Sequence, residues 1–225
     1  MPDAIRVAVD SGTVTALVYA AAPAARTETT LILGHGAGAP QSSEFMVGFA
    51  EALAARGADV VTFNFPYMEA GRRLPDRSET LEACFRDVIR AARERADLAA
   101  GRLVIGGKSL GGRMASHVAA AGLDGLGGVV FLGYPLHAPG KPEKLRAAHL
   151  TRIRQPMLFV QGSRDAFGTP EWLAPILDAL GSRARVHIVE GGDHSFAVSK
   201  RSGPPQREVF ARVQDEIARW LTETR

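Results

Sequence analysis

The stretch RLVIGGKSLGGRMASHVAA, residues 102–120, joins a short apolar run to a helical pattern through a glycine-rich turn around one serine. The run from Leu103 to Ile105 is typical of a buried strand, and helix-forming residues follow after Gly112. Glycine disfavours the interior of either element by roughly 0.5–1 kcal/mol. Four glycines within seven residues therefore indicate a backbone too crowded for side chains, with Ser109 at its centre.

Apolar segments on both sides of this turn alternate between strand and helix patterns. Continuous or alternating apolar runs predict strands at 5–9, 14–20, 29–34, 59–65, 102–107, 127–134, 156–162 and 184–191. Apolar residues three and four apart predict helices at 43–56, 78–98, 109–121, 170–180 and 205–222. Helices that alternate with strands cover a parallel sheet on both faces, so the pattern predicts an α/β fold with a mostly parallel central sheet of about eight strands.

The length of the chain predicts a single domain, residues 1–225. Only about twenty residues separate the predicted strands at 127–134 and 156–162, too few for a substantial cap domain. We therefore expect a site that is open to solvent.

Composition excludes several classes of function. No apolar run approaches the roughly 20 residues of a membrane helix, and the first residues lack the features of a secretory signal, so we expect a cytoplasmic protein with no membrane partner. The formal net charge is +3, but the basic residues are scattered, and nucleic-acid binding is not expected. Cys84 lies on the apolar stripe of the predicted 78–98 helix and is interpreted as a core residue. The oligomeric state is left open.

A nucleophile is predicted within the glycine-rich turn. Gly107 and Gly111 frame Ser109 in a G-x-S-x-G pentapeptide between a strand and a helix, a turn that exposes a serine hydroxyl. Such a hydroxyl is a poor nucleophile unless a base takes its proton and a third group orients that base. Asp165 and His194 each follow a predicted strand, in the chain order expected for this kind of fold. We predict that these three side chains form a catalytic triad.

Each of the three residues also has a structural interpretation. Ser109 could cap the following helix, Asp165 could bond to its own turn, and His194 could be a surface histidine. The other histidines are less well placed to act as the base; they are His117 on a helix, His187 in a strand, and His137 and His149 in the segment after Tyr134.

An acyl-transfer site also needs two backbone amides to stabilise a tetrahedral anion. The amide of Leu110, directly after the serine, is the first candidate. The second is the amide of Ala37, in the stretch LGHGAGAP (33–40) that follows an early strand. His35 in the same stretch could touch substrate, but a structural hydrogen bond is the favoured interpretation.

Four further side chains are candidates for contact with substrate. Tyr67 and Arg72 lie in a loop expected at the same sheet edge as Ser109, where an arginine could bind the carboxylate of an anionic ester. Lys108 precedes the serine, and Tyr134 follows a predicted strand. A solvated or backbone-bonded side chain is the alternative for the arginine and the lysine.

Taken together, these motifs resemble those of the α/β-hydrolases. The resemblance covers residues 31–196 and rests on the HG pair at 35–36, the G-x-S-x-G turn, the G-x-x-D turn that ends at Asp165 and the D-H pair at 193–194. Within that superfamily, NFPYMEAGRRLPD (64–76), GGKSLGGRMAS (106–116) and QGSRDAFG (161–168) are most similar to the small, capless dienelactone-hydrolase-like proteins and to the group that includes testis-expressed protein 30.

The resemblance implies hydrolysis through an acyl-enzyme on Ser109, with His194 as base, Asp165 as acid, and no metal or organic cofactor. The chain departs from dienelactone hydrolases proper, which use a cysteine nucleophile. We expect a hydrolase acting on a small-molecule ester or thioester. The same triad also serves peptidases and perhydrolases, and a non-catalytic interaction protein could keep the fold.

Overall fold

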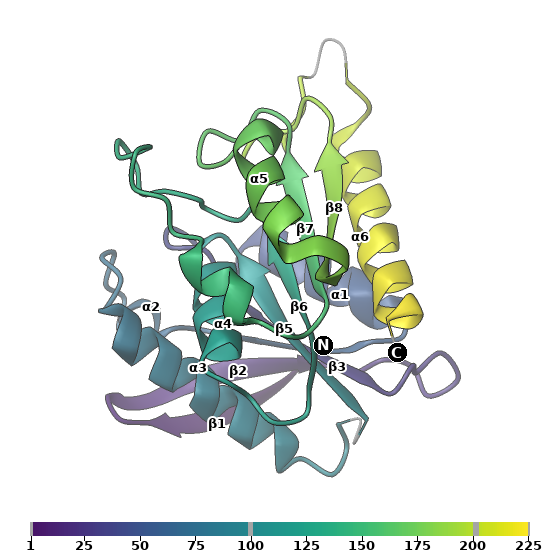
Figure 1. The fold of residues 1–225 in the computed structure, drawn as a ribbon. Helices are drawn as coiled ribbons and strands as arrows, with labels where there is room; N and C mark the ends of the chain where they lie inside the picture. Colours follow the sequence, from purple (N-terminus) through teal and green to yellow (C-terminus); the bar gives the residue numbers. More distant parts are fainter. Residues whose placement is uncertain (1, 99–100, 200–202, 225) are drawn as a thin grey trace.

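The computed structural model describes residues 2–98, 101–199 and 203–224 and contains an eight-stranded sheet (Figure 1). The strands are β1 (Asp3–Val9), β2 (Gly12–Tyr19), β3 (Thr29–Gly34), β4 (Asp59–Phe63), β5 (Arg102–Lys108), β6 (Leu126–Leu132), β7 (Met157–Gly162) and β8 (Ala184–Val189). The helices are α1 (Glu44–Ala55), α2 (Pro66–Glu69), α3 (Ser78–Arg93), α4 (Leu110–Ala120), α5 (Pro170–Leu180) and α6 (Gln206–Glu223), with short 3₁₀ turns η1 (Ala148–Arg152) and η2 (Gly181–Arg183).

The strand order is β1-β2-β4-β3-β5-β6-β7-β8. Strand β2 pairs antiparallel with both of its neighbours, β1 and β4. The other pairs, along the series β4-β3-β5-β6-β7-β8, are all parallel. The predicted mostly parallel sheet of an α/β fold is therefore confirmed. After β3 the chain moves to one side to form β4, and it then returns to the other side of β3 to form β5. Ligands of such sheets bind outside the carboxyl ends of the strands at this change of direction.

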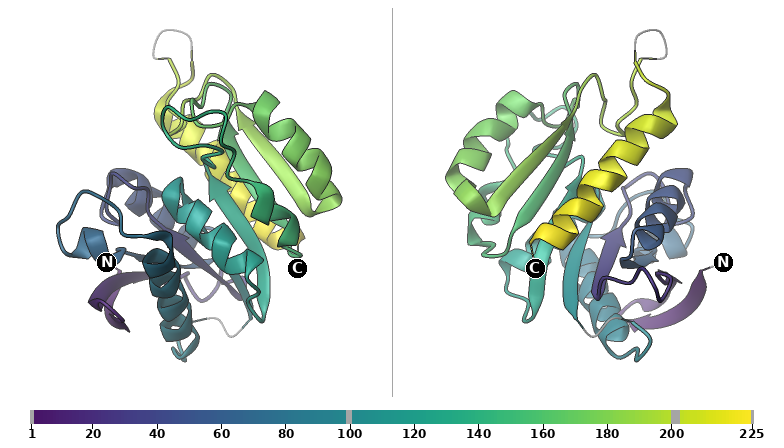
Figure 2. Two further views of the ribbon diagram at one scale, coloured as in Figure 1. Left: turned by 60° about the vertical axis from the view of Figure 1, so that its left-hand side comes forward. Right: turned by 90° about the vertical axis from the view of Figure 1, so that its right-hand side faces the viewer.

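Helices cover both faces of the sheet and divide the core into two layers (Figure 2). On one face, α3, α4 and α5 bury side chains such as Phe85, Met114 and Leu173 against the strands. On the other face, α1 and α6 contribute Phe49 and Trp220. Cys84 is buried on the inner stripe of α3, as predicted.

Several element ends differ from the sequence prediction. Helix α3 stops at Arg93 rather than near Leu98, because its apolar stripe ends at Ala92 and Leu98 reaches the core only after the chain has turned. Strand β4 ends at Phe63 because Phe65 is already the N-cap of the short helix α2, which was not predicted.

The segment between β6 and η1 forms turns and no cap domain, so that prediction is confirmed. Among the described residues, no helix is long and apolar enough to span a bilayer.

Candidate active site

The turn between β5 and α4 holds the serine of the pentapeptide. Ser109 has φ 49° and ψ −110°, a strained backbone conformation that residues with a side chain rarely adopt. Its amide donates to the carbonyl oxygen of Leu132 on β6 (3.0 Å), which ties the turn to the neighbouring strand. The Ser109 side chain makes no capping hydrogen bond to α4. Its hydroxyl therefore does not serve as a helix cap and is free for another partner.

Two glycines of this turn are required by the close approach of the β3 backbone. Gly34 on β3 pairs with Gly107 on β5 in the parallel ladder. A Cβ atom at either Gly107 or Gly111 would overlap the carbonyl oxygen of Gly34. A side chain at either position would push the start of α4, and Ser109 with it, away from β3. The crowding that the glycine cluster predicts is therefore present.

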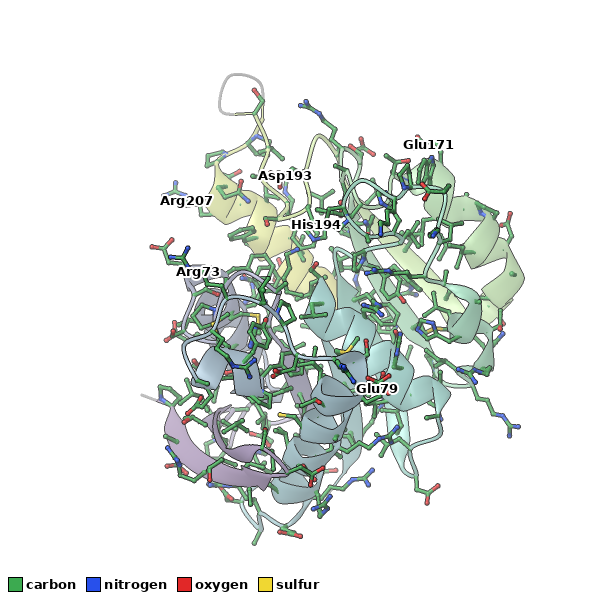
Figure 3. The ribbon with its side chains drawn as sticks, turned by 90° about the vertical axis from the view of Figure 1, so that its left-hand side faces the viewer. Arg73, Glu79, Glu171, Asp193, His194 and Arg207 are labelled. Atoms are coloured by element: carbon green, nitrogen blue, oxygen red, sulfur yellow. The ribbon has the colours of Figure 1, made fainter. Side chains whose placement is uncertain are left out.

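Ser109, His194 and Asp165 are joined by hydrogen bonds. The Nε2 atom of His194 lies 2.8 Å from the Ser109 hydroxyl oxygen, and Nδ1 lies 2.7 Å from Oδ2 of Asp165. With the hydrogen on Nδ1 donated to the carboxylate, the lone pair of Nε2 can accept the serine proton. Figure 3 shows His194 next to Asp193, at the end of the molecule where α6 begins. The geometry is that of a nucleophile, a base and an orienting acid.

The carboxylate of Asp165 is fully buried and held from several sides. Oδ1 accepts from the amide of Phe167 (2.8 Å), and Oδ2 accepts from the side-chain amide of Gln161 (2.8 Å) in addition to His194. Gln161 is itself fixed, because its Oε1 accepts from the amide of Tyr134 (2.9 Å). Sequence reasoning missed Gln161; the only signal was a polar residue within an apolar strand, four positions before the acid.

The loop that carries His194 is fixed by two charged side chains. Lys108 donates from Nζ to the carbonyl oxygen of His194 (2.7 Å). Burial lowers the pKa of this lysine to about 8, although the nearby carboxylates of Asp165 and Asp193 oppose the change. Asp193 accepts from the amides two and four residues ahead (2.8 and 2.9 Å) and so closes the loop on itself. Lys108 thus has a backbone partner, and Asp193 has a structural role.

The loop after β3 is held by side chains behind it. The amide of Phe65 donates to Nε2 of His35 (3.0 Å), so the hydrogen on Nδ1 is donated to the carbonyl oxygen of Gly36 (2.7 Å). Burial lowers the pKa of His35, which favours this neutral ring. Because the Gly36–Ala37 peptide is planar, fixing its carbonyl also fixes the direction of the Ala37 N–H. The hydroxyl of Tyr67 donates to the Ala37 carbonyl oxygen (3.0 Å) and holds the next peptide.

Ser109, Leu110 and Ala37 line one cavity of about 320 Å³. Its other walls include Leu81, His137 and Phe167, and the Phe167 ring packs edge-on against His194 with 4.6 Å between centroids. As the first residue of α4, Leu110 has an amide with no partner within the helix. Among the residues that the structure describes, no group of three or more His, Cys, Asp or Glu side chains is arranged to hold a metal ion.

The remaining candidates for substrate contact lie outside this cavity. Arg72 is exposed and forms an ion pair with Asp76 (2.7 Å), and only Asp76 reaches the cavity wall. Tyr134 is buried, and its hydroxyl donates to the carbonyl oxygen of Arg146 (3.0 Å). The substrate role expected of Tyr134 does not fit this position, because the apolar side chains of β6 and β7 enclose its ring.

A second serine–histidine pair lies about two turns further along α4. The hydroxyl of Ser116 lies 2.7 Å from Nε2 of His149 and donates to the carbonyl oxygen of Arg113 (2.6 Å). Ser116 is fully buried. In the described part of the chain, the nearest carboxylate in this cluster, Glu82, hydrogen-bonds to His117 and not to His149 (2.7 Å). In the described part of the chain this pair therefore lacks an orienting acid, and its serine is closed to a substrate.

Proteins similar to this chain share its fold. Among solved structures, an α/β serine hydrolase without a lid from Xanthomonas campestris superposes with a TM-score of 0.75 at 20% identity, covering 97% of this chain and 94% of that chain. A dienelactone hydrolase from Anabaena variabilis gives a TM-score of 0.76 at 19% identity, with 99% and 97% covered. Est1E from Butyrivibrio proteoclasticus gives 0.74 at 14% identity, with 98% of each chain covered.

The sequence also matches a family model over most of its length. The model describes an alpha/beta hydrolase domain, and the match covers residues 27–222. That range contains both loops of the cavity and all three members of the hydrogen-bonded chain from Ser109 to Asp165. The protein belongs to the alpha/beta hydrolase family.

Proposed function

We propose that this protein is a serine hydrolase that cleaves a small ester or thioester through an acyl-enzyme intermediate. One observation carries the proposal: hydrogen bonds run without a break from the Ser109 hydroxyl through the His194 ring to the buried carboxylate of Asp165. A serine becomes a nucleophile when a base can take its proton and an acid holds that base in the correct tautomer. Both requirements have a candidate side chain within hydrogen-bond distance of the next at this edge of the sheet, which supports the proposal.

In the first half of the proposed reaction, the Ser109 oxygen attacks the carbonyl carbon of the substrate while Nε2 of His194 takes its proton. Asp165 stabilises the imidazolium that results. The amides of Leu110 and Ala37 donate to the oxyanion of the tetrahedral intermediate. When the intermediate collapses, the alcohol or thiol leaves with the proton from His194, and Ser109 is acylated. Water then attacks the acyl-enzyme with His194 again as the base, and the acid is released.

The substrate class follows from the cavity and from the similar structures. A cavity of about 320 Å³ with mostly apolar walls suits a small acyl group, and no cap domain closes it. The similar structures include a serine hydrolase, a dienelactone hydrolase and an esterase domain, and these names support cleavage of an ester bond.

The test compares two serines of the same segment on p-nitrophenyl acetate and on S-phenyl thioacetate. Ser109→Ala should lower kcat at least about a thousandfold while thermal unfolding stays unchanged, because the hydroxyl contributes no structural hydrogen bond to the helix. Ser116→Ala is the matched control and should keep most of the activity. An active, folded Ser109→Ala variant, or an inactive but folded Ser116→Ala variant, would contradict the proposal.

A further inference from the structure

A second cavity lies between helix α4 and the 3₁₀ turn η1. Its volume is about 420 Å³, and five of its lining residues are basic or imidazole side chains: Arg113 and His117 from α4, Arg146 from the preceding loop, and His149 and Arg152 from η1. No acidic residue lines it among the residues described. We name it the basic cavity.

The basic cavity adjoins the catalytic cavity. Arg113 and Arg146 line both of them. Arg113 follows Ser109 by one helical turn, and its amide donates to the Ser109 carbonyl oxygen (3.0 Å). His117 follows by one more turn, so that the three side chains lie in a row along α4. The guanidinium groups of Arg113 and Arg146 therefore stand between the serine and the basic cavity, on the route that a substrate would follow along the helix.

The arginines of the basic cavity are not neutralised by the protein. In the described ranges, Arg113, Arg146 and Arg152 form no ion pair, whereas many other arginines do, including Arg56 and Arg95. The Nε atom of Arg113 is buried without any hydrogen-bond partner. A buried donor left unsatisfied is costly, which points to a ligand acceptor at this position.

Burial and the excess of positive charge act together on the pKa of two side chains in the basic cavity, His149 and Arg113. Burial, and then the charges of His117, Arg113 and Arg152, lower the pKa of His149 to about 4. Burial and the charge of Arg146 lower the pKa of Arg113. Two carboxylates lie nearby, and each forms one ion pair: Glu82 with His117 (2.7 Å), and Asp76, through Oδ1, with Arg72 (2.7 Å). The other oxygen of Asp76, Oδ2, is buried without a hydrogen-bond partner and belongs to a residue that lines the catalytic cavity and not the basic cavity.

We propose that the basic cavity binds a phosphate-type dianion carried by the substrate, while the ester or thioester bond lies at Ser109. Guanidinium groups match the geometry and the charge of phosphate oxygens. Three guanidinium groups in one cavity carry more positive charge than a single carboxylate would neutralise. This inference rests on the proposed hydrolase function for its catalytic half. The binding of the anion is argued from the basic cavity alone. Anion binding and hydrolysis can therefore be tested separately.

The kinetic test uses two matched substrates, p-nitrophenyl pentanoate and p-nitrophenyl 4-phosphonobutyrate, in which a phosphonate replaces the terminal methyl group. The wild-type enzyme should prefer the phosphonate ester in kcat/KM. Replacing both Arg113 and Arg152 by Gln should lower the ratio of the two kcat/KM values at least about tenfold, because phosphate-type contacts are lost. Arg212→Gln, an exposed charge change on α6 across the sheet, is the matched control and should leave the ratio unchanged.

The binding test does not depend on catalysis. Inorganic phosphate should raise the melting temperature of the Ser109→Ala protein, and the additional Arg113→Gln and Arg152→Gln changes should abolish that increase, whereas Arg212→Gln should not.

The combined outcomes separate the two proposals. If phosphate binds but neither ester is hydrolysed, the hydrolase function is overturned and the anion site is retained. Phosphate binding with an unchanged substrate ratio would show a site for a free anion and overturn the substrate assignment. No phosphate effect together with an unchanged ratio would overturn the inference as a whole.

Discussion

Three residues of the candidate site are held by partners that touch no reacting atom. Gln161 orients the carboxylate of Asp165, Lys108 holds the backbone of His194, and His35 fixes the peptide that ends at Ala37. Such support keeps the groups in place before a substrate binds. In enzymes, this preorganisation accounts for much of the rate enhancement. At this scale the three side chains that the structure joins by hydrogen bonds, Ser109, His194 and Asp165, could be predicted from their order after strands. The position of Gln161 could not, because it depends on the amide of Tyr134, 27 positions earlier in the chain. The burial of the Arg113 Nε could not be predicted either, because it depends on what packs around α4.

The acid can be tested against its neighbours in sequence. Asp165→Asn places an amide opposite Nδ1 of His194, which favours the wrong tautomer, so kcat should fall at least about a hundredfold with KM little changed. Glu190→Gln and Asp193→Asn should each cost less than about tenfold, since Glu190 is exposed and Asp193 bonds only to its own loop. All three variants are measured on one substrate. If Asp193→Asn or Glu190→Gln is the crippling change and Asp165→Asn stays active, the assignment of the acid is wrong.

Lys108 should leave a signature in the pH dependence of stability. The folded protein releases its proton from about pH 8, whereas the unfolded chain holds it to about pH 10.5. Between these values the unfolded state binds more protons, so the free energy of unfolding rises with pH. Relative to Lys108→Met, the wild-type protein should gain on the order of 2 kcal/mol between pH 7.5 and 9.5, measured by urea unfolding. If the difference in free energy of unfolding between the two proteins stays constant from pH 7.5 to 9.5, the pKa of Lys108 is not lowered in the folded protein.

At the scale of elements, the contact of β3 with the start of α4 decides where Ser109 lies. Gly34 and Gly111 let the two backbones meet without an intervening side chain. The existence and type of each strand and long helix could be predicted from apolar periodicity, because each buries one face or both. The ends of α3 and β4 could not, since they depend on where Leu98 and Phe65 reach the core.

The backbone contact predicts opposite effects for two glycine substitutions. Gly111→Ala would drive a methyl group into the carbonyl of Gly34, so the free energy of unfolding should fall by several kcal/mol, roughly 2–4, and activity should fall with it. Gly48→Ala, in helix α1 with open space around its Cβ position, should instead stabilise the protein by roughly 0.5–1 kcal/mol. Thermal and urea unfolding of both variants provide the measurement. If the two variants are equally stable, the start of α4 does not contact the backbone of β3 as described.

At the scale of the whole molecule, the reversal of strand order between β3 and β5 brings the loop after β3, which contains Ala37, and the serine turn to one edge. The loops after β7 and β8 add Asp165 and His194 at that edge. Alternation of strands and helices predicts the fold class, but the order of strands could not be predicted, because buried parallel strands have similar apolar sequences. The basic cavity was likewise hidden, since Arg113 and Arg152 are 39 positions apart in the chain.

The most direct test of the central claim is native labelling with a fluorophosphonate probe followed by peptide mapping. An activated serine hydroxyl displaces fluoride from the probe and keeps the phosphonyl group, whatever its natural substrate is. Trypsin cleaves after Arg113, so Ser109 and Ser116 fall on different peptides. We predict a single label, on the peptide that contains Ser109, which is lost in Ser109→Ala and after heat denaturation. No labelling of the native protein, or a label on the peptide with Ser116, would contradict the account.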